Sequence, residues 1–214
     1  MMKWRVLQIA DAAFPTGAFA HSNGLEAAAR LGEVRDLDAL IDDALWQAGH
    51  GALPFVASAH DAPSRIGELD ELCDAMLVNA VANRASRAQG RALAATCARV
   101  FDVSSIDDAV RARSLRVHVA PAFGALMRSL DVSKDDALRV HMHGALRTVT
   151  SAAVRLGLAG PNEAQRMTHA RADLLERIVE RCGVLRAEDA AQAAPLLDLF
   201  AASHADLDTK MFVS

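Results

Sequence analysis

Histidine and serine are the residue types in this chain whose spacing could support catalysis or metal binding. His141 and His143 are the one pair of histidines close in sequence. Their i, i+2 spacing on a predicted helix points the two rings about 200° apart, away from a shared metal ion. The other histidines considered show no pairing signal: His21, His50, His60, His118 and His169. We therefore predict no metal site and no cofactor.

A second candidate is the segment Ala20–Gly24, which reads Ala-His-Ser-Asn-Gly and resembles the G-x-S-x-G motif of serine hydrolases. That motif needs a buried strand directly before the serine. Here Pro15 and Gly17 precede it and predict a loop. Ser22 is better explained as a cap of the following helix, and no catalytic residue is predicted.

Motifs for other reaction classes are missing from the sequence. Without a Gly-Lys dipeptide there is no phosphate-binding P-loop, and H-E-x-x-H is also absent. Cys73, Cys97 and Cys182 are far apart and odd in number, which fits neither a disulfide framework nor a C-x-x-C site.

Composition and charge restrict the class of protein further. The 214 residues are 52% hydrophobic but only 4% aromatic, and 23 basic residues stand against 27 acidic ones. A net charge of −4 argues against a nucleic-acid partner, which would need clustered basic residues. No run of 18 apolar residues predicts a membrane span, and Gln8 and Asp11 interrupt the first apolar stretch. We expect a cytoplasmic protein that does not bind membranes.

Hydrophobic periodicity predicts the helices that must position these residues. Apolar residues recur at three and four positions almost throughout, as expected for amphipathic helices. Ser133 with Asp136 and Ser105 with Asp108 are possible capping boxes. The predicted helices cover 4–12, 22–31, 37–49, 52–60, 67–80, 83–101, 106–115, 121–130, 133–156, 161–182 and 188–206. This predicts an all-α, single-domain bundle of about ten helices over residues 1–206, followed by a tail, 207–214.

Two segments at opposite ends of the chain resemble a known family. Residues 7–26 contain P-x-G-x-F-x-H-S-x-G-L-E, similar to the opening signature of the urease accessory protein UreF family. The ending resembles the family's closing pattern through His204, Lys210, Met211, Phe212 and Ser214. Looser agreement lies between, in Gly90–Leu93 and Ser151–Pro161. The family often has Arg at the position of Lys210.

This resemblance implies a helical homodimer that is not an enzyme. UreF proteins bridge UreD, also called UreH, and the GTPase UreG. They are thought to recruit UreG and to modulate its GTP hydrolysis while nickel is inserted into apo-urease. The missing P-loop fits a partner of a GTPase.

The candidate partner-binding residues lie in the two signatures. The first contributes Phe14, Pro15, Thr16, Gly17, Phe19, His21, Ser22, Gly24 and Glu26. Pro15 reduces the entropy lost on binding, and the two Phe rings are either partner anchors or buried staples between helices. His21 is expected to be the most exposed residue on the UreG side, and Glu26 to favour the positive end of its helix.

The second signature contributes Lys210, Met211, Phe212 and Ser214. We expect this tail to become ordered by inserting into a groove of UreD, with Met211 and Phe212 as anchors. A frayed terminus is the alternative.

Two other functions stay open at this point. One is a helical adaptor unrelated to urease. The other is a helical enzyme with an internal pocket, using His141, His143 or His169 with glutamates. For the dimer we expect a face on the helices between about residues 83 and 160.

Overall fold

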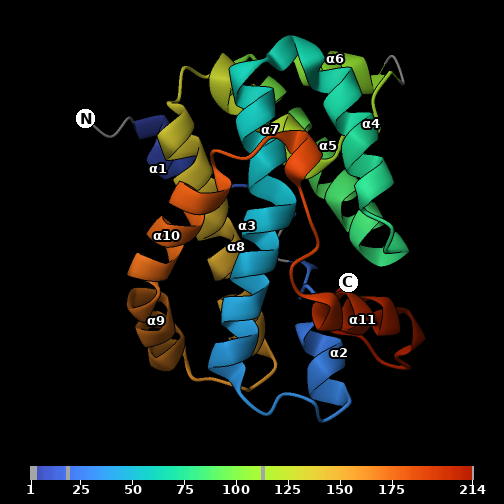
Figure 1. Ribbon diagram of the computed structural model, residues 1–214, viewed down its shortest axis with the longest axis vertical. Coiled ribbons are helices and arrows are strands. Elements are labelled where there is room, and N and C mark those ends of the chain that lie inside the picture. Colours follow the sequence, from blue (N-terminus) through green and yellow to red (C-terminus); the bar gives the residue numbers. More distant parts are fainter. Residues whose placement is uncertain (1–3, 18–19, 112–113, 214) are drawn as a thin grey trace.

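The computed structural model describes residues 4–17, 20–111 and 114–213. Within them the protein is all helical, as predicted, and no strand occurs. Figure 1 shows the arrangement. The α-helices are α1 (Trp4–Ala10), α2 (Leu25–Arg30), α3 (Leu37–Asp61), α4 (Ile66–Met76), α5 (Ala80–Phe101), α6 (Ser105–Arg111), α7 (Val119–Ser129), α8 (Lys134–Arg155), α9 (Pro161–Ala170), α10 (Ala172–Cys182) and α11 (Pro195–Ser203).

Helix α3 runs through the centre of the bundle, with α9 and α10 along one side and α4 and α5 along the other (Figure 1). It begins at the N-cap Asp36, whose carboxylate accepts a hydrogen bond from Ala39 N at 3.0 Å. Its strongest packing partner is α7. A Cβ added at Gly124 of α7 would lie 2.2 Å from the Val56 carbonyl oxygen. The two backbones can therefore cross this closely only because position 124 has no side chain.

One predicted boundary between helices is wrong, and one real boundary was not predicted. The predicted helices 37–49 and 52–60 form one helix, α3, with Pro54 inside it. The predicted boundary fell at Gly49 and Gly51, where one helix ended at residue 49 and the next began at residue 52. In the structure a Cβ at Gly49 would meet Ile178 of α10 at 2.4 Å, so this glycine marks tight packing within a continuous helix.

The predicted helix 161–182 is instead two helices, α9 and α10, which meet at Arg171. The Arg171 side chain is buried and binds the start of α3 through Asp38 and Asp42, with ion-pair distances of 2.8 and 2.7 Å. It also donates to the Met167 carbonyl. This tertiary contact fixes the corner, and helical periodicity does not encode it.

The predicted caps are partly confirmed. The Ser133 hydroxyl accepts from Asp136 N at 3.1 Å at the start of α8, as expected. At α6 it is Ser104, one residue before the predicted Ser105, whose hydroxyl bonds Asp108. Other ends are shorter than predicted: α2 begins at Leu25, α4 ends at Met76, and α11 covers only Pro195–Ser203.

Candidate functional site

A buried carboxylate joins the two ends of the chain. Glu26, in the first turn of α2, is fully buried. Its Oε1 accepts Met211 N at 2.7 Å, and its Oε2 accepts Phe212 N at 3.1 Å. The His204 Nε2 lies 3.0 Å from the same Oε2. A buried charge is stable only where such donors replace water, and here the closing segment provides all three.

The charge of Glu26 is favoured by these contacts. Burial alone would raise the pKa of the Glu26 carboxyl, but the bonds from Met211, His204 and Phe212 outweigh it and hold the pKa below its usual value. His21 lies nearby and is also buried. Burial, and then the neighbouring His204, lower the pKa of the His21 imidazole. The cluster therefore favours one carboxylate beside an uncharged His21.

The tail is held at further points besides Glu26. Phe212 is buried, and the Arg155 guanidinium of α8 lies 4.0 Å from the centre of its ring, a cation–π contact. Val213 N donates to Ala20 O at 2.8 Å, in the loop before α2. Figure 1 shows the C-terminal end beside α2 and α11. The closing signature thus packs directly on the opening one.

Gly24 allows the two segments to approach. Its φ of +88° is in the left-handed region, which suits glycine. A Cβ there would lie 3.0 Å from Leu197 O and 3.1 Å from Ala201 N, both in α11. A larger residue at position 24 would therefore push α11 away from α2.

The opening loop is anchored on one side and open on the other. Phe14 is buried and stacks on Phe101 at 5.9 Å between ring centres, and Pro15 O accepts the Thr96 hydroxyl at 3.0 Å. Pro15 and Gly17 themselves are exposed, and Thr16 is half-buried. Proline and glycine therefore form the accessible part of this signature.

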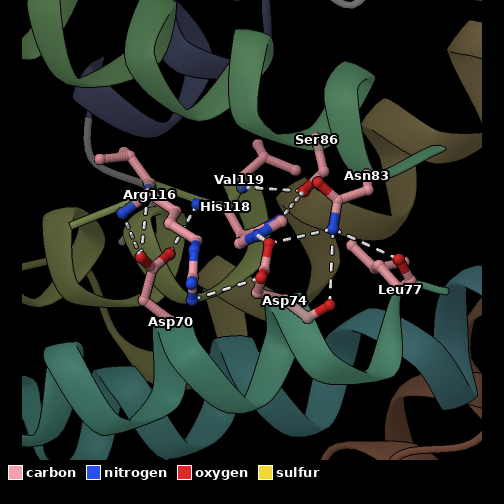
Figure 2. A network of polar contacts seen from close by, with 9 residues as sticks. Asp70, Asp74, Leu77, Asn83, Ser86, Arg116, His118 and Val119 are labelled. Atoms are coloured by element: carbon pink, nitrogen blue, oxygen red, sulfur yellow. Dashed lines mark hydrogen bonds and ion pairs between the residues drawn. The ribbon is translucent and has the colours of Figure 1, made fainter. Parts of the chain in front are cut away.

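A second polar network, which the sequence analysis missed, lies between α4, α5 and the start of α7 (Figure 2). Buried Asp70 accepts the backbone N–H groups of Arg116, Val117 and His118 at 2.7 to 3.0 Å. The His118 ring is fully buried and lies between Ser86, at 3.1 Å from Nδ1, and Asp74, at 3.0 Å from Nε2.

This Ser–His–Asp order resembles a catalytic triad, but its bonds explain it as a fastening of α7. Ser86 Oγ also accepts Val119 N at 3.2 Å, so it satisfies a free N–H group at the helix start. Asp70 does the same for the three preceding residues. The sequence signal was the i, i+4 pair Asp70 and Asp74 beside apolar Leu69 and Cys73, on one face of α4.

An apolar cavity of about 310 Å³ lies between α3, α5, α8 and α11. His141 and His143 both line it. His141 makes an edge contact with Phe123 at 5.3 Å, and burial lowers its pKa to about 4. An imidazole of such low pKa remains uncharged and is a poor base at neutral pH.

Metal chemistry finds no further support in the described residues. Among them, no three His, Cys, Asp or Glu side chains lie close enough to hold an ion. Cys73, Cys97 and Cys182 are buried and free, and burial raises the pKa of the Cys73 and Cys97 thiols to about 12. In the part of the chain that the structure describes, no helix has the length and apolar character to cross a membrane.

Comparison with known proteins identifies the family. The UreF family model matches residues 31–172. The chain is 35% identical to "Urease accessory protein F" of Arabidopsis thaliana, over all of this chain and 93% of that protein. The protein of that name in Oryza sativa subsp. indica is 35% identical over 98% of this chain and 84% of its own length. "Urease accessory protein UreF" of Paenarthrobacter aurescens is 30% identical over 97% and 96%.

The chain belongs to the UreF family. This confirms the resemblance seen in the two signatures. The family model itself covers neither signature, because it matches only residues 31–172. The relatives extend the match over nearly the whole UreF chain, and they replace the alternative of an adaptor unrelated to urease.

The structure corrects the expected exposure of His21 in this UreF chain. His21 was expected to be the most exposed candidate on the UreG side, but only 4% of it is accessible. The closing segment packs on this part of the loop: His204 lies close enough to lower the pKa of His21, and Val213 N donates to Ala20 O. Ser22 was predicted to cap α2, but the N-cap is Gly24; Ser22 lies two residues earlier, is fully buried, and its hydroxyl accepts Glu26 N at 3.4 Å.

Some of the remaining signature residues are buried and others are exposed to solvent. Phe14 and Phe212 are buried, so as placed they act as packing residues of UreF itself. Met211 is 47% exposed, and Lys210 is exposed with its Nζ bonding Ala205 O at 2.8 Å. Phe19 and Ser214 lie outside the described residues. Partner binding by any of these residues, and ordering of the tail by a partner, stay predictions.

Proposed function

We propose that this UreF chain is a non-enzymatic accessory protein of urease maturation, which bridges UreD (UreH) and the GTPase UreG. In this role it recruits UreG and modulates its GTP hydrolysis while nickel enters apo-urease. Nickel is the cargo of this assembly, and no resident cofactor of the chain is proposed. Membership of the UreF family supports the proposal.

The main structural support is the junction of the two signatures at Glu26. An adaptor needs a rigid surface that presents a few accessible groups, because ordering a flexible surface on binding costs free energy. Glu26 fixes the backbone of Met211 while the Met211 side chain remains half exposed. The exposed residues Pro15, Gly17 and Lys210 lie in the same two signatures. Together they form a candidate contact surface for UreD and UreG.

We also infer that the chain forms a homodimer in the cytoplasm, with its dimer face on the helices between about residues 83 and 160. Three free, buried cysteines are consistent with a reducing compartment. Helices α5 and α8, which belong to that stretch, contribute to the lining of the mostly apolar cavity.

The test is a pull-down of UreG by a preformed complex of this chain with UreD. UreG capture that depends on the chain, together with urease activation that is lost when the chain is omitted, is the expected result. Val184→Ala, at a position 80% exposed and outside both signatures, is the matched control variant. UreG capture by UreD alone at equal strength, or full activation without the chain, would refute the proposal.

A further inference from the structure

A small pocket lies directly beside the tail. Its volume is about 170 Å³, and it is bounded by the loop of residues 12–17, by one face of α8 and by Phe212. The pocket is therefore built from the opening signature, the closing signature and the helix between them. Residues of α8 that line it include Arg147, Thr148, Ser151 and Arg155.

Three polar side chains of this pocket, those of Arg147, Thr16 and Ser151, have hydrogen-bonding capacity left over. Arg147 is half-buried and donates from Nη1 to the Ala10 carbonyl, and no carboxylate among the described residues pairs with it. The hydroxyls of Thr16 and Ser151 make no hydrogen bond within the same part of the chain. A half-buried guanidinium and two hydroxyls thus face a cavity with donors to spare.

The charge in the pocket is positive. Arg147, Ser151 and Arg155 follow each other at i, i+4 spacing, so they share one face of α8. No acidic side chain is among the described residues that line the pocket. An incoming anion would therefore meet the Arg147 guanidinium and hydroxyl donors, with Arg155 held against the Phe212 ring beside them.

The other walls of the pocket are apolar, and they determine which anion fits. They include Phe14, Ala152 and Phe212. A guanidinium binds a carboxylate through paired, charge-assisted hydrogen bonds, and apolar walls suit a short methylene stem. A volume of about 170 Å³ suits an acidic side chain rather than a nucleotide.

We propose that this pocket receives an aspartate or glutamate side chain of a partner protein, with Arg147 as its main contact. The inference rests on the proposed function, because it requires UreD or UreG to supply that side chain. It adds the chemistry of the contact: a carboxylate of the partner is bound between the two UreF signatures.

The experiment measures binding of UreD, and then of UreG, to the full-length chain at low and high salt. Arg147→Gln should weaken the binding of the partner that supplies the carboxylate about tenfold and reduce its salt dependence. Arg166→Gln, at an exposed position on α9, is the matched control and should change neither.

A second variant tests the pocket independently, in case Arg147→Gln does not fold. Thr16→Val with Ser151→Ala removes only hydroxyls that bond no described residue, so the melting temperature should not change. Its partner binding should weaken about threefold to tenfold. Unchanged binding in both variants, while the wild-type chain binds its partners, overturns the pocket assignment and leaves the proposed function intact.

Titration with two small anions distinguishes a site for a carboxylate side chain from a site for a free oxyanion. Glutarate titrated into the isolated chain should shift the NMR signals of Thr16 and Ser151 in the wild type but not in Arg147→Gln. Inorganic phosphate at equal ionic strength should shift them less. Equal or stronger shifts with phosphate would indicate a free-oxyanion site and overturn the assignment to a partner side chain, as would no shift with glutarate. Failure of the wild-type chain to bind UreD and UreG would count against the proposed function, whatever glutarate does.

Discussion

At the scale of single residues, Glu26 is the group on which the junction of the two signatures depends. It is fully buried and accepts hydrogen bonds from Met211 N, Phe212 N and the His204 ring. From the sequence, Glu26 was expected in the first turn of a helix, where its negative charge favours the positive helix end. Glu26 does lie in the first turn of α2, but its partners are about 180 residues away, and local sequence gives no sign of them.

Replacing Glu26 by glutamine should destabilise the protein and loosen its tail. The amide has almost the same shape but carries no charge, and its nitrogen cannot accept a hydrogen bond. Hydrogen bonds to a charged group contribute about 1.5–3 kcal/mol each, so we expect a loss of about 2 kcal/mol in the free energy of unfolding. Chemical denaturation measures this, and hydrogen exchange at Met211 and Phe212 reports release of the tail. Slow exchange in Glu26→Gln equal to wild type would contradict the assignment.

The same carboxylate predicts the direction of a pH effect. Because the pKa of Glu26 is lower in the folded protein than its ordinary value of 4.5, its contribution to stability is fully present above about pH 4.5. It is lost as the pH falls through the lower, folded-state pKa. The difference in unfolding free energy between wild type and Glu26→Gln should therefore shrink below pH 4.5. A difference that stays constant from pH 7 to pH 3 would exclude Glu26 as its source.

At the scale of elements, the sequence predicted helices well and corners poorly. The helix from Ser133 was predicted with its cap because the signal is local, a serine with an acidic residue three positions later. The corner at Arg171 was missed because its cause is a contact with Asp38 and Asp42 on α3. The continuous α3 was missed because glycines that permit close packing look, in sequence, like glycines that end helices.

Gly124 gives the sharpest test of close packing between elements. Gly124→Ala would place a methyl group 2.2 Å from the Val56 carbonyl oxygen, where neither backbone can easily move. Overpacking of this kind costs about 1–3 kcal/mol or more, so we expect a loss of about 3 kcal/mol and a clearly lower melting temperature.

Gly144 of α8 provides the matched control for this substitution. Nothing lies within 4 Å of an added Cβ there. Gly144→Ala should therefore stabilise the protein by about 0.5–1 kcal/mol, the usual gain in a helix interior. Equal effects of the two substitutions would mean that the α3–α7 crossing is not as close as described.

At the scale of the whole molecule, the sequence identified the segments of the candidate site but not how they contact each other. The two signatures marked the correct segments, because pattern similarity needs no spatial knowledge. Their contact through Glu26, the burial of His21 and the inward position of Phe212 depend on how the bundle brings the chain ends together. The Asp70–His118 network was missed for the same reason: the spacing of Asp70 and Asp74 was a local signal, but their partners come from separate elements (Figure 2).

In the tail, the structure distinguishes side chains that can contact a partner from backbone groups that close the fold, which the sequence could not do. Met211→Ala removes a half-exposed side chain but keeps the backbone N–H that binds Glu26. We therefore expect about tenfold weaker binding of UreD, as for a typical interface anchor, with an unchanged melting temperature.

Deleting residues 210–214 should abolish co-purification with UreD, because it removes the proposed anchors. It also removes the N–H donors of Met211 and Phe212 and leaves Glu26 buried with His204 as its remaining partner from the closing segment. The truncated chain should be less stable for this reason, whereas Val184→Ala, at an exposed position, should alter neither stability nor binding. If the truncated chain still binds UreD as tightly as the full chain, the tail serves only to close the fold, and the UreD contact must lie elsewhere on the bundle.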